Sequence, residues 1–477
     1  MKRCGLLALV MVTACTASVE PDQETTSTAE SSTTSSVVQD TEPSTTTTAT
    51  TVPTPPPTIP PAPEVPSGPL DPLAEEGLRM FLEGIFADDF DSEHLGQVVE
   101  GRDARAAWLL ADLMRFYQRG DPRDALVSKF RELTGYEGTS TGEIDFVWAF
   151  NALMTWDLPA WDGYPDMKAS VYTRVDPRWR VFFEQDVSVD WRLVTWGGVL
   201  ADDRPFGDNG PCNCIPSLDD PATTDATGGD WYEDDRIVFG IEVNGETLAL
   251  PKNQMEIHEM INTTLGGRDI GVPYCTLCGS AQAYFTDNVA GFERVVLRTS
   301  GLLARSNKMM YDLTTNSLVD TFTGEATTGP LAEAGVVLDQ TTVVAATWGD
   351  WKAAHPSTRI LAEDGGIDRV YADDPLGGRD DNGPIFPIGV ADPRLPVQEN
   401  VVGVVTSDGT PIAFPVNAVE DVFRAGEEFA FEGMTVRLTD GIRVFDAEGN
   451  ELPTHQAFWF AWSQFHPGTL VWRPSDS

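Results

Sequence analysis

Three things are scarce in this 477-residue chain: cationic side chains, long apolar runs and cysteine. Only 32 Lys and Arg residues stand against 74 Asp and Glu residues, which gives a formal net charge of −42. Because such a surface repels phosphate groups, we expect no binding to DNA or RNA. No stretch after residue 14 reaches the roughly 18 apolar residues that a spanning helix needs, so the body is expected to be soluble.

Several catalytic signatures are also missing. Asn262 stands where the His-Glu-x-x-His pattern of zinc metalloproteases requires a second histidine after His258. Ser300 is not part of a Gly-x-Ser-x-Gly turn, and no glycine-rich phosphate loop follows a strand and opens a helix. The sequence therefore offers no motif for a hydrolase or a nucleotide-binding enzyme, and whether the protein is an enzyme stays open.

The N-terminus has the pattern of an exported precursor. Two basic residues precede the apolar run from Leu6 to Val12, and the segment that ends at Cys15 resembles the lipobox of bacterial lipoproteins. We therefore expect a signal peptide over residues 1–14 and lipidation of Cys15. The membrane would then be a partner through the lipid anchor, with the body on the outer face of the cytoplasmic membrane or at the cell surface. The alternative is an ordinary secretory signal with an incidental cysteine.

Composition divides the rest of the chain into three parts. Residues 15–69 are rich in Ser, Thr and Pro with almost nothing to bury, which predicts a disordered stalk. Residues 70–186 repeat apolar side chains at helical spacing, and their paired helices resemble helical-repeat units. Residues 187–477 carry short Val, Ile, Thr and aromatic runs between turn signals, which predicts a β-rich domain. The expected fold class is α+β.

Two segments of the β-rich part resemble each other. "GIEVNGETLALPKNQMEIHE" and "GVVTSDGTPIAFPVNAVEDV" share six residues, and the spacing from the turn glycine to the glutamate is identical. This similarity predicts an internal duplication, with units near residues 237–300 and 401–470. The second unit has Arg437 and Asp440 roughly where the first has two cysteines. The cysteines are therefore interpreted as an addition to a scaffold that does not require them.

Four cysteines remain in the body if Cys4 leaves with the signal peptide and Cys15 carries lipid. The Cys-x-x-Cys-Gly turn at Cys275 and Cys278 brings two sulfurs to one ion, and its glycine lets backbone N–H groups approach the thiolates. Zinc, copper(I) and iron all accept sulfur ligands, so the ion is not identified. The predicted metal ligands are Cys275, Cys278, His258, Cys212 and Cys214, the last three as candidates to complete the shell.

Oxidation offers a second interpretation. Outside the cytoplasm thiols tend to form disulfides, so Cys212 or Cys214 paired with Cys275 or Cys278 would staple a loop to a hairpin. A bond within Cys-Asn-Cys is expected to be strained. A thioredoxin-like pair requires a helix that starts at the first cysteine, whereas Cys275 lies between β-like segments. The function is therefore metal handling or a redox step at the Cys-x-x-Cys site, or else that of a non-catalytic, disulfide-stapled binding or envelope module.

Seven motifs in order resemble the domain-of-unknown-function family 3179 over about residues 190–470. They are "IPSLDDP", "EIHEMIN", "YCTLCGSAQAYF", "SGLLARSNKMMYDLTTNSL", "TGEATTGPLA", "TWGDWKAAHPSTRIL" and "FWFAWSQFHPGT". The chain departs from the family where "DDRPFGDNGPCNC" is inserted, which adds Cys212 and Cys214, and where Val319 follows Leu318 in place of a tryptophan. The resemblance implies no specific activity.

Overall fold

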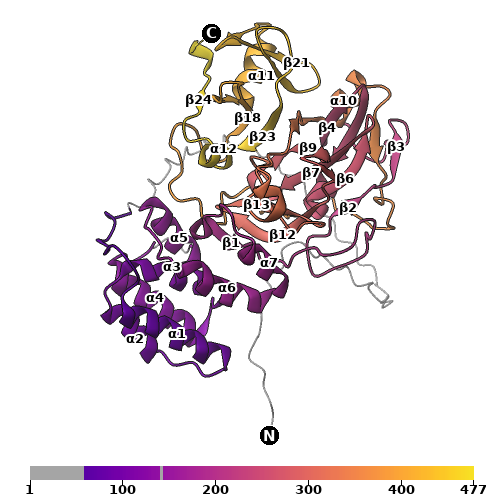
Figure 1. The fold of residues 1–477 in the computed structure, drawn as a ribbon. Coiled ribbons are helices and arrows are strands. Elements are labelled where there is room, and N and C mark those ends of the chain that lie inside the picture. Colours follow the sequence, from indigo (N-terminus) through magenta and orange to yellow (C-terminus); the bar gives the residue numbers. More distant parts are fainter. Residues whose placement is uncertain (1–58, 140–142, 477) are drawn as a thin grey trace, which may run out of the picture.

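The computed structural model describes residues 59–139 and 143–476 (Figure 1). The predicted signal peptide, the predicted lipidation site Cys15 and most of the predicted stalk lie outside the described residues. The α-helices are α1 (Pro72–Phe86), α2 (Glu93–Glu100), α3 (Ala107–Phe116), α4 (Gly120–Thr134), α5 (Asp145–Thr155), α6 (Tyr164–Val175), α7 (Arg180–Glu184), α8 (Lys252–His258), α9 (Gly329–Glu333), α10 (Trp348–Ala354), α11 (Val416–Arg424) and α12 (Trp459–Phe465).

The strands all follow the first seven helices in the chain. They are β1 (Val194–Trp196), β2 (Leu218–Asp219), β3 (Thr223–Asp225), β4 (Ile237–Val243), β5 (Glu246–Pro251), β6 (Met260–Leu265), β7 (Arg268–Cys275), β8 (Ser280–Ala281), β9 (Ala283–Phe285), β10 (Asp287–Val289), β11 (Phe292–Arg294), β12 (Leu297–Ala304), β13 (Asn307–Asp312), β14 (Leu318–Asp320), β15 (Gln340–Thr341), β16 (Val344–Thr347), β17 (Arg359–Leu361), β18 (Asn400–Val405), β19 (Pro411–Pro415), β20 (Ala430–Phe431), β21 (Met434–Leu438), β22 (Ile442–Phe445), β23 (Thr454–Phe458) and β24 (Leu470–Val471).

Local sequence signals explain where several elements begin and end. The carboxylate of Asp71 accepts hydrogen bonds from the backbone N–H groups of Leu73 and Ala74 and so caps α1. Helix α4 ends at Gly135, which takes the left-handed conformation with φ of 70°. Strands β4 and β5 form a hairpin, whose turn residues Asn244 and Gly245 both have positive φ.

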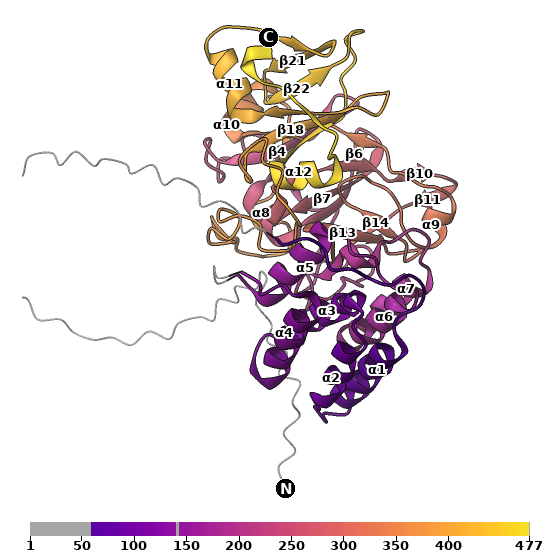
Figure 2. The ribbon, with the colours of Figure 1, turned by 90° about the vertical axis from the view of Figure 1, so that its left-hand side faces the viewer.

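The strands form six separate sheets. The strand orders are β1-β12-β13-β14, β10-β11, β15-β9-β7-β6-β2 with β8 paired to β7, β16-β4-β5-β17-β3, β23-β18-β19-β24, and β20-β21-β22. Helices α1–α7 occupy one end of the molecule, and β13 lies between them and the other sheets in both views (Figures 1 and 2). The orange and yellow C-terminal segment packs beside the sheet that contains β4.

The first helices and the first sheet share one hydrophobic core. Buried Trp196 on β1 and Tyr311 on β13 belong to the same cluster as Trp108 on α3. A buried ion pair reinforces this junction, since Nζ of Lys168 lies 2.8 Å from Asp112 and 2.6 Å from the backbone oxygen of Val194. Both charged side chains are fully buried. The helices therefore form a base on which the β part is built.

The predicted duplicated β-rich domain is wrong. The proposed first unit, residues 237–300, is divided among sheets: β4 and β5 lie in one, β6, β7 and β9 in a second, and β12 in a third. Helix α3 contacts α4, α5 and α6, and the helical-repeat resemblance stays a prediction. The likeness of the two segments does not extend over residues 237–300 as one unit, because the strands after α8 join other sheets.

What the two segments share extends beyond the hairpin and the short helix after it, α8 or α11. The strands β16-β4-β5-β17 and β23-β18-β19-β24 have the same order, each with an antiparallel first pair and a parallel last pair, and in each a glycine of the hairpin's first strand receives a tryptophan ring. Cys275 lies on β7, in a different sheet, so the second segment gives no evidence on whether the fold requires the cysteines. The site has to be judged on its own geometry.

No helix among residues 59–139 and 143–476 has both the length and the apolar character needed to cross a lipid bilayer.

Candidate functional site

The Cys-x-x-Cys-Gly segment is a tight turn at the end of a buried strand. Cys275 is the last residue of β7, residues Thr276–Cys278 form a single 3-10 turn, and the chain then enters β8. Gly279 has φ of 59°, and a Cβ atom at this position would lie 3.1 Å from the ring of Phe458. Glycine is therefore required both by the left-handed backbone and by the close packing. The turn folds the second cysteine back beside the first.

The two thiols are free, buried and adjacent. The sulfur atoms of Cys275 and Cys278 lie 4.0 and 3.3 Å from the same acceptor, the backbone oxygen of Ser306. Burial raises the pKa of the Cys278 thiol well above its usual value, and a hydrogen bond with Cys275 adds to the increase. Cys278 is thus held as a thiol, and both sulfurs are able to reach one small ligand.

A small cleft with a volume of about 60 Å³, called the dithiol cleft below, reaches Cys275. Its wall contains an ion pair, because Nζ of Lys308 lies 2.8 Å from Oε2 of Glu259. The other carboxylate oxygen of Glu259 accepts a hydrogen bond from Thr276 within the cysteine turn. Arg379, Thr299 and Ser306 also line the cleft, and the remaining side chains are apolar: Val199, Ile215, Leu277, Leu302, Leu303, Leu376 and Phe386. The cleft has room for an ion with one or two water molecules.

His258 does not join the cysteine pair. Both ring nitrogens are already hydrogen-bonded, to the backbone oxygen of Pro216 and to the hydroxyl of Tyr371, each at 2.7 Å. Burial lowers the pKa of His258 to about 4, so the ring is neutral near pH 7. It lines a different pocket, beside Asn209 and Arg369. The geometry makes His258 a buried link between segments and not a neighbour of the two sulfurs.

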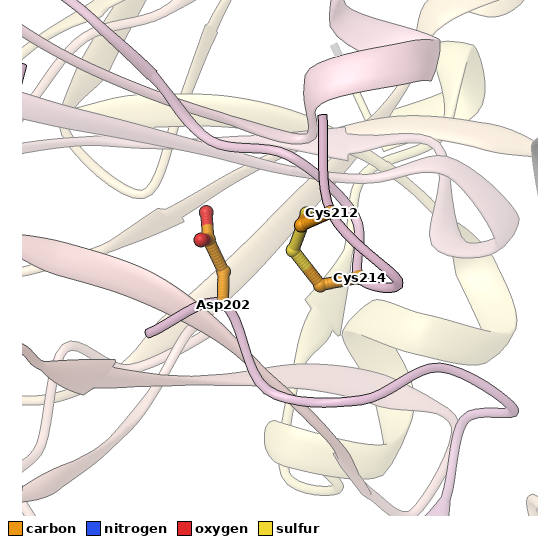
Figure 3. A group of neighbouring side chains, drawn as sticks. All are labelled: Asp202, Cys212 and Cys214. Atoms are coloured by element: carbon orange, nitrogen blue, oxygen red, sulfur yellow. A yellow bond between two sulfur atoms is a disulfide. The ribbon is translucent and has the colours of Figure 1, made fainter. Parts of the chain in front are cut away.

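Cys212 and Cys214 form a disulfide with each other (Figure 3). The expected cross-pairing with Cys275 or Cys278 is therefore wrong. A Cys-Asn-Cys segment closes its own bond because its two Cα atoms lie 5.2 Å apart, within the normal range for a disulfide.

The disulfide lies next to the carboxylate of Asp202, as Figure 3 shows. Among the described residues, these three form the one group of His, Cys, Asp or Glu side chains whose ligand atoms all lie within 4.8 Å of one another. However, Asp202 is held by Arg204, with two contacts of 2.7 Å, and by the N–H of Ser217. Since bonded sulfurs are not thiolates, Cys212 and Cys214 can serve as metal ligands only after reduction.

Sequence reasoning missed Glu259, Lys308 and Ser306 as neighbours of the cysteines. Glu259 lies within the quoted motif "EIHEMIN", while Ser306 and Lys308 lie within "SGLLARSNKMMYDLTTNSL". No spacing rule connects these motifs, because β12 and β13 first have to pair with each other and then pack against β7. Both motifs belong to the set that resembles one family, and this is the only signal in the sequence that could have suggested that they meet.

Comparison with known proteins identifies a family but no activity. No curated protein matches the chain. No solved structure matches it either. The family model begins at Cys212, within the inserted loop, and ends just before Asp440, so it contains the cysteine turn, Glu259 and Lys308 but not the last predicted motif. Residues 212–439 match the model of the family described as protein of unknown function (DUF3179).

Proposed function

We propose that this protein binds a soft metal ion, copper(I) above all, between Cys275 and Cys278, as an extracytoplasmic protein tethered by lipid at Cys15. One observation carries the metal proposal: two free, buried thiols converge on a single acceptor, the backbone oxygen of Ser306. Two sulfurs held this way need little movement to bind the same ion. The turn that holds them is anchored by Gly279 and by the hydrogen bond from Thr276 to Glu259.

The number of ligands favours copper(I) over zinc. A structural zinc site takes four protein ligands, usually Cys or His. No third His, Cys, Asp or Glu in the described part of the chain forms a tight ligand group with Cys275 and Cys278. Copper(I) is soft, prefers thiolates and is satisfied by two of them in a linear arrangement.

Burial sets the expected pH dependence of binding. The metal must replace the thiol protons, and the pKa of Cys278 is raised by its burial. Affinity should therefore increase with pH through the neutral range, with protons released on binding. The ion pair of Glu259 and Lys308 keeps the local charge balanced before the ion enters.

A titration tests the metal site. The reduced full chain is titrated with copper(I) against bicinchoninate as a competing chelator, and we expect one ion per chain. Replacing Cys275 and Cys278 by Ser should abolish this binding. The matched control, Cys212→Ser with Cys214→Ser, removes the other two body cysteines and should retain it. Equal loss in both variants, or no binding in the unaltered chain, would refute the proposal.

A second candidate function is thiol redox chemistry at the same pair. It is favoured by an asymmetry, because Cys275 lines the dithiol cleft whereas Cys278 is 0% exposed. In dithiol exchange, one accessible sulfur attacks and a neighbouring one resolves the mixed disulfide. Equilibration in glutathione buffers, with alkylation to count thiols, would reveal a reversible Cys275–Cys278 disulfide. If the pair neither oxidises reversibly nor binds copper, a non-catalytic envelope module is the better description.

The location is a separate proposal that rests on the N-terminal sequence pattern. Expression of the full precursor in a bacterium should give a protein that enters the detergent phase and incorporates labelled palmitate. Cys15→Ala should lose both properties. Retention of the label in that variant would refute lipidation at Cys15.

A further inference from the structure

A larger cleft lies on the other side of the cysteine turn from the dithiol cleft. Two adjoining pockets, of about 380 and 260 Å³, share Ile237, Lys252, Asp380 and Asp381 on their walls. We call their union the amphipathic cleft. It lies between the sheet that contains β4 and the sheet that contains β18 and β23, and its combined size is that of a small-molecule site.

One end of the amphipathic cleft is apolar and aromatic. The rings of Phe239, Tyr274 and Phe458 contribute to its wall, together with Val402 and Ile442. These side chains come from strands of different sheets. An apolar body of a ligand could therefore be enclosed from both sides, and a flat one could stack on the rings.

The other end is strongly acidic. The amphipathic cleft contains seven carboxylates and two cationic groups, an excess of five negative charges. The cation nearest its centre, Lys252, is already engaged, since its Nζ lies 2.7 Å from Glu256 and 3.2 Å from Asp380. Lining carboxylates such as Asp381, which is exposed, are left to attract a positively charged ligand.

A buried acceptor at the acidic end lacks a donor. Asn253 is only 3% exposed, and its Nδ2 donates to the backbone oxygen of Ala372 at 3.0 Å. Its Oδ1 atom is buried without a hydrogen-bond partner. An unpaired buried carbonyl oxygen is destabilising, so a ligand that supplies an N–H group there is favoured.

We propose that the amphipathic cleft binds a primary ammonium compound with an apolar body. The acidic end supplies the charge, Oδ1 of Asn253 accepts an N–H, and the aromatic end encloses the carbon skeleton. A bare metal ion fits less well, because no three carboxylates of the described cleft residues have their oxygens within 4.8 Å of one another. This site goes beyond the proposed metal function and does not depend on it.

Calorimetry on the full chain, with 2-phenylethylamine as the probe, tests the site. Three comparators change the features in turn: 3-phenylpropionate has a carboxylate in place of the ammonium group, phenethyltrimethylammonium keeps the positive charge but lacks N–H groups, and methylammonium lacks the apolar body. We expect each to bind at least tenfold more weakly than the probe. If 2-phenylethylamine and phenethyltrimethylammonium bound equally well, the role of Asn253 would be refuted. If methylammonium bound as tightly as the probe, the cleft would be a general acidic surface and not a site for an apolar body.

Variants locate the site. Asn253→Leu removes the orphan acceptor, and the exposed substitution Asp381→Asn removes one charge without touching the core. Each should weaken binding of 2-phenylethylamine at least fivefold, whereas Glu333→Gln on α9, outside the cleft, should leave it unchanged. The proposal would be overturned if Asp381→Asn and a correctly folded Asn253→Leu variant both bound the probe as tightly as the unaltered chain. Displacement of the probe by calcium at equal concentration would also overturn it. Replacement of Cys275 and Cys278 by Ser should not affect this binding.

Discussion

Glu259 and Lys308 form an ion pair on the wall of the dithiol cleft, although 49 positions separate them in the sequence. Nζ of Lys308 lies 2.8 Å from Oε2 of Glu259 and 2.7 Å from the backbone oxygen of the same residue. The two side chains are 5% and 9% exposed. Because Glu259 also holds Thr276, the pair ties the cysteine turn to the end of α8.

The first prediction concerns this pair. Lys308→Met leaves the carboxylate of Glu259 buried without its counter-charge, which should lower the free energy of unfolding by about 3–5 kcal/mol. Urea unfolding measures the loss. The matched control is Lys352→Met, which breaks an exposed pair with Asp234 and should cost at most about 1 kcal/mol. Adding Glu259→Gln to Lys308→Met should recover part of the stability, and a strictly additive double variant would contradict the coupling.

The second prediction concerns two tightly packed glycines. A Cβ atom on Gly240 would lie 2.3 Å from the ring of Trp351, and one on Gly403 would lie 2.0 Å from the ring of Trp462. Gly240→Ala and Gly403→Ala should therefore each destabilise the fold by about 1–3 kcal/mol or more through overpacking. Gly96→Ala on α2 is the control, since its Cβ meets nothing within 4 Å and alanine favours helix. Thermal unfolding should show a lower midpoint temperature for Gly240→Ala and Gly403→Ala, and an unchanged or higher one for Gly96→Ala.

The third prediction is a pH dependence of stability. In the unfolded chain His258 takes up a proton below about pH 6.5, but in the folded protein only below about pH 4, because burial lowers its pKa. Stability is thus highest above pH 6.5 and should fall by about 2 kcal/mol from this group between pH 6.5 and pH 5. His258→Gln should flatten this part of the profile in urea unfolding. Buried His455 and His466, whose pKa values burial lowers to about 3 and about 4, keep part of the slope.

The fourth prediction concerns the oxidation state of the body cysteines. Alkylation of the unreduced, denatured chain followed by peptide mapping should label Cys275 and Cys278 and leave Cys212 and Cys214 unlabelled until a reductant is added. In the native state both labelled thiols should react slowly, because they are buried. A peptide that joins the 212–214 loop to the 275–278 turn would contradict the structure.

Parts of the fold followed from local chemistry alone. The stop of α4 at Gly135, the hairpin turn at Asn244 and Gly245, and the proximity of two cysteines three positions apart each depend on a few neighbouring residues. Backbone sterics act over that same short range, so such features are encoded by neighbouring residues. The predicted duplication failed because its first unit, residues 237–300, includes strands that join two other sheets with partners elsewhere in the chain.

The sequence by itself determined the acidic character of the chain, its match to a family model over residues 212–439, and the turn that pairs Cys275 with Cys278. Only the tertiary structure decided that His258 is occupied by Pro216 and Tyr371, that Cys212 bonds to Cys214, and that Glu259 meets Lys308 beside the thiols. The physical reason is the separation along the chain of the residues that each property depends on. Charge and turn geometry are properties of residues and their neighbours, whereas most of these contacts form only once strands distant in the chain have paired and excluded water between them.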